Sequence, residues 1–327
     1  MNKIAEFALI DKYFKPLATN SKASQGLRDD VARISLEKDE ELIVSKDLIF
    51  EDVHFLLKDG GAKIAAKLML SNLSDIASSG STPKYYMLGF SKNDKLSEDF
   101  YKEFCDELKK IQKKYKISLI GGDTIKSCEK LFFSLTIFGI SKKNKVLSRK
   151  NAKDKDLIFV SGSIGDAYLG LLSKTRPEII FNKKNEKYFL DRHFYPSPRI
   201  NLGQELVKQN LSKCAIDISD GLLADLNQIC KESMLEAVIY KDKIPLSKQA
   251  SEVIEQINFR NLISGGDDYE LIFTAKKENK NKILQLAKKL KIELNHIGFL
   301  KKTNSVKITI LDNKNREIKF EKYGYQH

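Results

Sequence analysis

The sequence predicts a two-domain protein of the α/β or α+β class. At about 100–200 residues per domain, a chain of 327 residues is long enough for two domains that each bury a core. Short apolar runs of strand length alternate irregularly with stretches in which apolar residues recur at helical spacing. A lysine-rich connector at 142–155 separates two such halves, so we expect domains at 1–148 and 149–327.

The first half of the chain mixes strands and helices. Strands are predicted where short apolar runs lie between turn residues, and helices where apolar residues recur every three or four positions. Ser97 followed by Glu98 and Asp99 is typical of a helix start. The predicted elements are strands at 42–50, 85–90, 117–120 and 131–140 and helices at 62–79 and 97–115.

The second half follows the same patterns, with glycines and prolines separating its elements. The first strand leads into a glycine-containing turn at 162–165, and a Pro-Ser-Pro corner at 196–198 precedes a helix. We predict strands at 157–161, 215–218, 269–274 and at the end of the chain, helices that end at Leu172 and Cys230, and helices at 200–208 and 280–290.

Composition argues against several classes of protein. No stretch approaches the roughly 18 uninterrupted apolar residues of a membrane span, and the first residues lack a secretory apolar region and cleavage site. The four cysteines show no zinc or disulfide spacing and are interpreted as reduced thiols. We therefore expect a cytoplasmic protein with no membrane partner.

The net charge of +13 favours an anionic partner. The lysines, however, are scattered in short runs, and neither an aromatic-rich binding surface nor a zinc-finger or RRM signature is present. We interpret them as a solvated surface that also attracts small phosphate-bearing molecules, and we expect no nucleic-acid partner.

Aspartates beside small residues are the candidates for chemistry. Asp220 is compatible with a helix N-cap and Asp123 with a turn. Asp47 in an apolar strand and Asp75 in an apolar helix are harder to explain without a cation, because an unpaired buried carboxylate is costly. The others are Asp29, Asp30, Asp217, Asp267 and Asp268.

Carboxylates, phosphates and water are the usual ligands of Mg²⁺, and nearby glycines allow backbone to approach phosphate. The aspartates therefore predict a nucleotide site with several magnesium ions, assembled from distant segments. Neither a P-loop nor the protein-kinase motif set is present.

Seven segments resemble, in order along nearly the whole chain, the motifs of the thiamine-monophosphate kinase family. They are VSKDLIFEDVHF, LSNLSDIASSGSTP, LIGGDT, RHFYPSPRI, IDISDGLLADL, SGGDDYELIFT and GYQH. LSNLSD, GGDT and DISDGL are shared with the wider superfamily of aminoimidazole ribonucleotide synthetase and selenophosphate synthetase. The V-x-x-D-x-x-x-x-x-V-H-F, R-H-x-x-P-x-P-R and GGDDYEL versions are more particular to the kinase.

The resemblance implies a two-domain aminoimidazole ribonucleotide synthetase-like fold. Strands of the N-terminal domain, which also binds ATP and magnesium, would form a β-barrel-like interface across a homodimer, and the C-terminal domain would be α/β. It also implies that ATP phosphorylates thiamine monophosphate to thiamine diphosphate, as a step of thiamine diphosphate biosynthesis. A phosphate monoester is already ionised near neutral pH, so direct in-line transfer needs alignment and charge neutralisation rather than a general base.

The resemblance carries roles onto individual residues. The magnesium ligands would be Asp30, Ser45, Lys46, Asp47, Asp75, Asp123, Asp217 and Asp220, with Asp47, Asp75, Asp123 and Asp220 central to catalysis. ATP would contact Gly122, Asp123, Arg149 and Ser219. Thiamine monophosphate would contact His54, Glu270 and Tyr325.

Four positions depart from the family pattern. The sequence has Arg28 in place of glycine and Lys46 in place of threonine, and it departs within 149–152 and 324–327. Lys46 either places its ammonium at the metal position or turns its side chain away and binds through its carbonyl. His54 is also compatible with a half-buried strand end, and Arg149 with an ordinary surface cation.

Two alternatives remain open from the sequence. One is another ATP-dependent member of the superfamily with a different acceptor, although the first residues offer no reactive cysteine for selenophosphate synthesis. The other is a degenerate family member or a basic nucleic-acid-binding protein.

Overall fold

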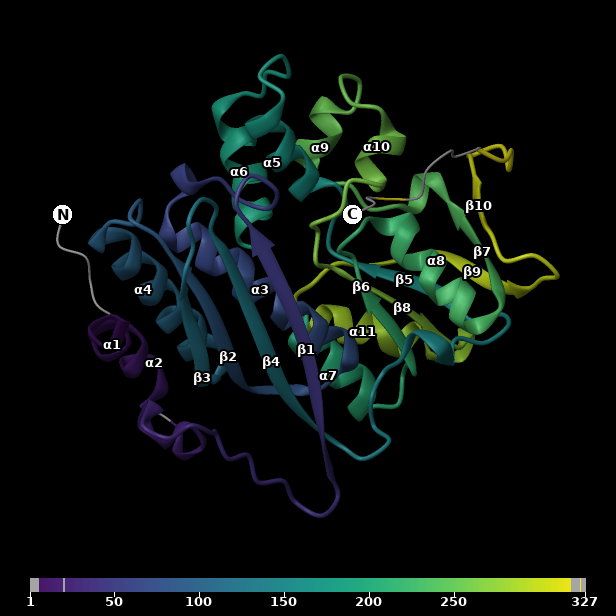
Figure 1. Ribbon diagram of the computed structural model, residues 1–327. Helices are drawn as coiled ribbons and strands as arrows, with labels where there is room; N and C mark the ends of the chain where they lie inside the picture. Colours follow the sequence, from purple (N-terminus) through teal and green to yellow (C-terminus); the bar gives the residue numbers. More distant parts are fainter. Residues whose placement is uncertain (1–5, 20, 319–323, 325–327) are drawn as a thin grey trace. The chain divides into compact units, whose positions relative to one another are not determined.

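The computed structural model describes residues 6–19, 21–318 and 324 (Figure 1). The chain divides into two compact units, the first comprising Met1–Ile76 with Ser81–Asn144 and the second Ala77–Gly80 with Lys145–His327. Among the described residues, no helix is both long enough and apolar enough to span a bilayer. This organisation confirms the prediction of a mixed α/β chain in two parts.

The first unit contains a four-stranded sheet with the strand order β1-β4-β2-β3. Its strands are β1 (Glu40–Phe50), β2 (Thr82–Lys92), β3 (Ser118–Lys126) and β4 (Phe132–Lys142). β4 pairs antiparallel with β1 and β2, whereas β2 and β3 are parallel. Parallel neighbours need a long crossover, and here the chain makes it through a helix.

Two long helices, α3 (Gly61–Ser79) and α4 (Glu98–Tyr115), pack on one face of this sheet. Phe104 of α4 lies with its ring 5.3 Å from that of Phe90 and 5.2 Å from that of Phe133. Ser97 caps α4 as its sequence predicts, accepting a hydrogen bond from the backbone N–H of Phe100. The opposite face of the sheet carries exposed apolar side chains.

Short helices at the start of the chain were not predicted from the sequence. They are α1 (Glu6–Leu9), η1 (Ile10–Phe14), α2 (Lys15–Ala18) and η2 (Lys22–Leu27), drawn in purple in Figure 1, and η3 (Leu57–Asp59) follows β1. They are anchored on the sheet and on α4. The ring of Phe14 lies 5.3 Å from that of Phe90, and Gln112 donates to the carbonyl of Leu17 over 2.7 Å.

The second unit contains a six-stranded sheet with the order β10-β7-β9-β5-β8-β6. Within this sheet, β10 and β7 are the one parallel pair among the described strands. The strands are β5 (Leu157–Ser161), β6 (Cys214–Asp217), β7 (Leu235–Tyr240), β8 (Leu271–Ala275), β9 (Leu294–Lys302) and β10 (Ile308–Leu311).

Helices complete two apolar cores in the second unit. One core joins the sheet to α8, and the other joins α5, α6, α9 and α10. The helices are α5 (Asp166–Thr175), α6 (Lys183–Phe194), α7 (Ile200–Lys208), α8 (Leu222–Ser233), α9 (Lys248–Val253), α10 (Phe259–Ile263) and α11 (Lys280–Leu290), with short η4 (Arg149–Asn151), η5 (Lys241–Lys243) and η6 (Lys277–Asn279).

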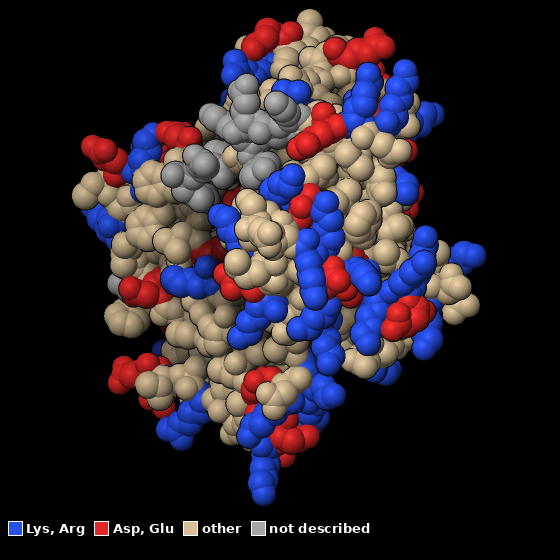
Figure 2. Space-filling model, turned by 90° about the vertical axis from the view of Figure 1, so that its right-hand side faces the viewer, with Lys and Arg blue, Asp and Glu red and all other residues tan. Residues whose placement is uncertain are grey.

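The basic surface contains many acidic neighbours. Figure 2 shows lysine and arginine side chains spread over the face that it draws, with acidic side chains among them. Lys142 pairs with Asp39 over 2.8 Å, and Arg176 pairs with Glu178 over 3.5 Å. Exposed pairs of this kind contribute little stability, and they are consistent with a solvated lysine-rich surface.

Candidate functional site

β1 places two of the predicted ligands beside helix α3. Alternate residues of a strand point to opposite faces, and Ser45 and Asp47 point to the face that α3 covers. Ser45 Oγ donates to Asp75 Oδ2 over 2.5 Å. Burial, and then the charge of Asp75, raise the pKa of Asp47 to about 7, opposed by a hydrogen bond from Ser71. Two carboxylates and a hydroxyl thus lie together.

Lys46 lies on the other face of the same strand. Its ammonium donates to Ser134 Oγ over 2.6 Å, and Ser134 belongs to the neighbouring strand β4. Of the two positions that the sequence left open for this side chain, the structure has the one turned away from Asp47 and Asp75. Metal binding through the carbonyl of Lys46 stays a prediction.

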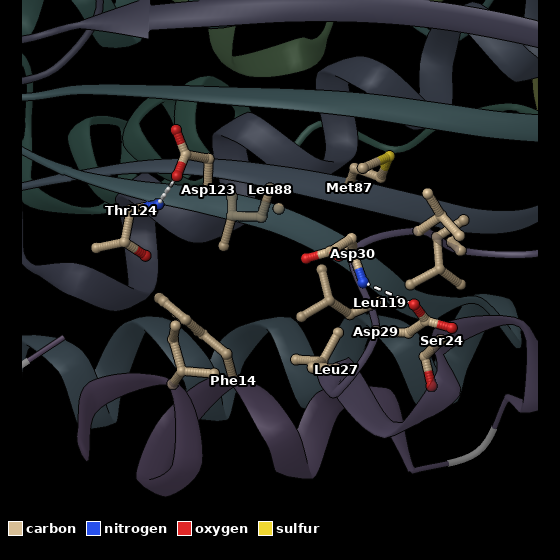
Figure 3. Close-up of a pocket in the computed structure, with 16 residues that line it drawn as sticks. Phe14, Ser24, Leu27, Asp29, Asp30, Met87, Leu88, Leu119, Asp123 and Thr124 are labelled. Carbon is tan, nitrogen blue, oxygen red and sulfur yellow. Dashed lines mark hydrogen bonds between the residues drawn. The ribbon is translucent and has the colours of Figure 1, made fainter. Parts of the chain in front are cut away.

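Asp30 and Asp123 line one pocket of the first unit, which has a volume of about 190 Å³ (Figure 3). Its apolar wall includes Phe14 and Leu27 of the N-terminal helices, and its other side is formed by β2 and β3. Asp123 Oδ1 accepts the backbone N–H of Thr124 over 2.9 Å within β3, so Asp123 does not serve a turn. Gly121 also lines the pocket.

Gly122 brings β3 close to β2 beside this pocket. A Cβ at Gly122 would lie 2.1 Å from the backbone oxygen of Leu88, so a side chain does not fit there. The two strands therefore meet with bare backbone next to Asp123. An exposed backbone edge with a carboxylate beside it is compatible with a phosphate bound through a metal ion.

His54 lies in the turn that follows β1. Its ring Nδ1 accepts the backbone N–H of Phe50 over 3.1 Å, and the backbone N–H of His54 donates to the Phe50 carbonyl over 2.9 Å. The ring is half-buried, as the strand-end interpretation expects. These contacts hold the ring in the turn, and a contact with thiamine monophosphate stays a prediction.

In the second unit, Asp217 ends β6 and is buried, and Ser219 and Asp220 follow in a loop. The carboxylate of Asp225 accepts the backbone N–H groups of Ser219 and Asp220 over 3.0 and 3.1 Å. Burial and the charge of Asp220 raise the pKa of Asp225 to about 7. Helix α8 has Gly221 as its N-cap, so the N-cap interpretation of Asp220 is wrong.

Glu270 is fully buried and holds four hydrogen bonds. Arg192 donates to Oε1 over 2.8 Å, and Arg199 donates to both oxygens over 2.6 and 2.5 Å. Ser161 Oγ donates to Oε2 over 2.6 Å. These partners occupy the carboxylate that the resemblance assigns to the substrate, and the substrate contact stays a prediction.

The last two predicted residues are Arg149 and Tyr325. Arg149 lines an open cavity of about 420 Å³ together with Ser148, Lys150 and Gln228 of the second unit. Its carbonyl accepts hydrogen bonds from Cys214 and Ser233. Tyr325 lies outside the described residues.

Three residues that hold the groups of the candidate site in place were not predicted from the sequence. Asp225 stands inside the IDISDGLLADL motif, and Arg192 and Arg199 stand at the two ends of RHFYPSPR. The signal was present in each case, because a carboxylate or guanidinium inside a recognised motif needs a partner. Glu270, the partner of both arginines, is distant in sequence, whereas Asp225 is bonded to the backbone of its own motif, and both pairings were visible only in the structure.

The chemistry of the oxygen donors suits Mg²⁺. In the described part of the chain, no three acidic, histidine or cysteine side chains are grouped to hold a metal, whereas Asp47 and Asp75 form an interacting pair. Mg²⁺ typically uses one or two carboxylates together with water and substrate phosphates, so pairs fit its habit. A cation beside Asp47 and Asp75 would also relieve their mutual repulsion.

Two family models cover most of the chain. The model of the AIR synthase related protein, N-terminal domain, matches residues 28–141, and that of its C-terminal domain matches 153–310. Among curated relatives, the thiamine-monophosphate kinase of Buchnera aphidicola subsp. Acyrthosiphon pisum is 34% identical over 99% of both chains. That of Bacillus subtilis is 31% identical over 98% of this chain and 99% of its own.

Solved structures agree with the sequence relatives. A thiamine-monophosphate kinase from Stenotrophomonas maltophilia has a TM-score of 0.82 and 32% identity, over 93% of this chain and 96% of that chain. A structure described as AaThiL complexed with AMPPCP and TMP has a TM-score of 0.77 and 27% identity, over 100% and 99%. The hydrogenase maturation protein HypE, at 20% identity, shares the fold alone. These full-length similarities show that the chain belongs to the thiamine-monophosphate kinase family.

Proposed function

We propose that this protein transfers the γ-phosphoryl group of ATP to thiamine monophosphate, giving ADP and thiamine diphosphate. Relatives similar over the full length carry this activity in their names, and the AaThiL neighbour binds AMPPCP and TMP. The observation that carries the proposal is the Asp47–Asp75 pair. Two repelling, half-buried carboxylates, one of which accepts a hydrogen bond from a hydroxyl, are suited to a divalent cation.

The residues of this chain would bind and align the reactants. Asp30, Asp47, Asp75 and Asp123 of the first unit, and Asp217 and Asp220 of the second, would hold magnesium, together with Ser45 and the carbonyl of Lys46. Bound magnesium supplies neutralisation of phosphate charge. Gly122, Arg149 and Ser219 would orient ATP.

His54, Glu270 and Tyr325 would contact thiamine monophosphate. The acceptor phosphate is itself the nucleophile, so no side chain is required to remove a proton. For Glu270, a substrate hydrogen bond would replace one made by Arg192, Arg199 or Ser161.

We also propose that two copies of the chain pair through the uncovered face of the first sheet. The side chains of Val44, Leu48 and Phe50 on β1 are 53%, 55% and 42% exposed there. Met87 and Ile125 extend the apolar surface over β2 and β3. Exposed apolar side chains gathered on one face of a sheet are typical of an interface. The four free thiols are consistent with a reducing compartment such as the cytoplasm.

The direct test incubates purified protein with ATP, Mg²⁺ and thiamine monophosphate and measures thiamine diphosphate and ADP. We expect both products in equal amounts, and we expect Asp75→Asn to abolish turnover without unfolding the protein. Asp106→Asn is the matched control, because Asp106 is exposed on α4 of the same unit. If no thiamine diphosphate forms at enzyme concentrations near that of the substrate, the proposal is wrong.

A further inference from the structure

The 266–270 segment is held through side chains that alternate along it. Asp268 and Glu270 are both buried. Asp268 accepts the backbone N–H groups of Gly165 and Ala167, at the start of α5, over 2.8 and 3.4 Å. Glu270 is held by Arg192, Arg199 and Ser161 as described above. Every second residue of the segment is therefore anchored in the interior.

The residues between these anchors have strained backbones. Asp267 has φ 63° and Tyr269 has φ 49°, in the left-handed region that residues with a Cβ rarely adopt. Such conformations persist only where the surroundings impose them, and they cluster at functional sites. The anchors at Asp268 and Glu270 are the groups that impose them here.

The 266–270 segment is hydrogen-bonded to the loop that carries Asp217, Ser219 and Asp220. Three backbone hydrogen bonds of 2.8 Å join the two: Asp267 N–H to the Ser219 carbonyl, Tyr269 N–H to the Ile218 carbonyl, and Ile218 N–H to the Glu270 carbonyl. Gly266 packs against the loop so closely that a Cβ would lie 2.4 Å from the Ser219 oxygen. A shift of Glu270 would therefore be passed directly to the loop.

Stability alone does not explain the arginine cluster. Buried ion pairs are often no more stabilising than apolar residues of the same volume, because their charges must leave water. Arg192 Nε is moreover buried with no hydrogen-bond partner among the described residues. Ser161 and Gly162 add to the fit, since a Cβ at Gly162 would lie 2.1 Å from Glu270 Oε1. The cluster fixes one orientation of one carboxylate.

We propose that Arg192 and Arg199 are positioning residues that act through Glu270 to hold the 217–220 loop in the geometry that binds magnesium and ATP. This inference rests on the proposed function for its kinetic consequences. Neither arginine needs to touch a reactant for this role. The RHFYPSPR segment would then serve the nucleotide loop, which is distant from it in sequence.

The first arm of the test measures the loop without any substrate. Amide hydrogen exchange is compared in wild type, Arg192→Met, Arg199→Met, Glu270→Gln and Arg316→Met. The last is the control, because Arg316 pairs with Asp312 through Nε and Nη2 on the surface of the same unit. We expect faster exchange in peptides covering 215–221 and 266–270 for the three cluster variants, with β9 and α11 unchanged and the control like wild type.

The second arm measures kinetics. Because small displacements of a binding group are costly, we expect a roughly tenfold or greater loss in kcat and a raised Mg²⁺ concentration for half-maximal rate in the cluster variants. Arg192→Met should cost little more when Glu270→Gln is already present, since both act through one contact. Arg192→Lys and Arg199→Lys should restore part of the loss, because each retains a cation.

The arms separate the two proposals. If the wild-type protein makes no thiamine diphosphate, the proposed function is wrong. The amide hydrogen-exchange measurement still tests the positioning role of the two arginines. Loop exchange equal to wild type in Arg192→Met and Arg199→Met would overturn the inference. A uniform increase in hydrogen exchange across the second unit, together with a normal kcat for the folded fraction, would also overturn the inference. Where a methionine variant does not fold, the lysine variant decides, and wild-type exchange and kinetics in it count against the inference.

Discussion

Carboxylates in the interior and at the candidate site of this protein have two different kinds of partner. Glu270 is matched by two guanidinium groups, whereas Asp47 faces another acid, Asp75. A raised pKa in the folded state means that the ionised acid is destabilised by folding. The ordinary pKa of an aspartate is 3.8, and that of Asp47 is raised to about 7. The penalty for Asp47 therefore grows as the pH rises from 3.8 through about 7, and it is constant at higher pH.

This sign gives a prediction for the metal-free protein. In chelator at pH 8, Asp75→Asn should melt at a higher temperature than wild type, because the repulsion with Asp47 is gone, and the difference should shrink towards pH 4. Added Mg²⁺ should raise the melting temperature of wild type and much less that of the variant. Thermal scans with and without Mg²⁺ measure both. Equal Mg²⁺ shifts in the two proteins would contradict a magnesium role for Asp75.

The cysteines give a second prediction at the same scale. Burial raises the pKa of Cys105, Cys214 and Cys230 to about 12, so their reactive thiolate forms are scarce at pH 8. Cys128 is exposed. Iodoacetamide should label Cys128 alone in the folded protein and all four thiols in denaturant, as read by mass spectrometry. Cys128→Ser is the control, and rapid labelling of that variant would contradict the assignment.

At the scale of elements, the sequence predicted what local pattern determines. Helix α4 begins after Ser97 as predicted, and α7 and α11 have the predicted bounds. Helix α6 was missed because its apolar side chains are confined to its C-terminal half, which is too short to show a clear helical period. Strand β3 runs through Gly121 and Gly122, although two glycines in a row are typical of a turn. The absence of a side chain at Gly122 is what allows β3 to lie against β2.

The two glycines of β3 form a matched pair for a test. At Gly122 a Cβ would meet the backbone of Leu88, which cannot move aside, whereas at Gly121 it would lie 3.0 Å from the flexible end of Met87. We expect Gly122→Ala to lose about 1–3 kcal/mol of unfolding free energy, as overpacking does. Gly121→Ala should stay within about 0.5 kcal/mol. Urea denaturation measures both, and equal losses would show that the β2–β3 approach is not the constraint.

The candidate site shows the same limit. The identities of Asp47, Asp75 and Asp220 stood out because acids in apolar or glycine-rich surroundings are costly to leave alone. Their immediate partners, such as Ser45 for Asp75 and Asp225 for the 219–220 backbone, did not. Hydroxyls and motif-internal acids are common in any sequence, and only the fold selects the one that lies within hydrogen-bonding distance of the site residue.

At the scale of the whole molecule, the uncovered sheet face is the feature that one chain leaves unexplained. A strand whose alternate residues are apolar on both faces is typical of a sheet buried on both sides, and β1 has Val44, Leu48 and Phe50 on the face opposite α3. Lys46 lies among them but directs its ammonium to Ser134 of β4. The face is thus apolar at its centre, with its one lysine on β1 paired within the sheet.

Leu48→Lys places a charge in the middle of this face. In a symmetric pair each substitution occurs twice, so two new ammonium groups would have to be buried without partners, which is strongly unfavourable. We expect wild type to sediment as a dimer and Leu48→Lys as a folded monomer. Val53→Lys is the control, since Val53 is 57% exposed but lies in the turn after β1. A wild-type monomer would contradict the proposed pairing, and an unchanged dimer in Leu48→Lys would place the interface elsewhere on the molecule.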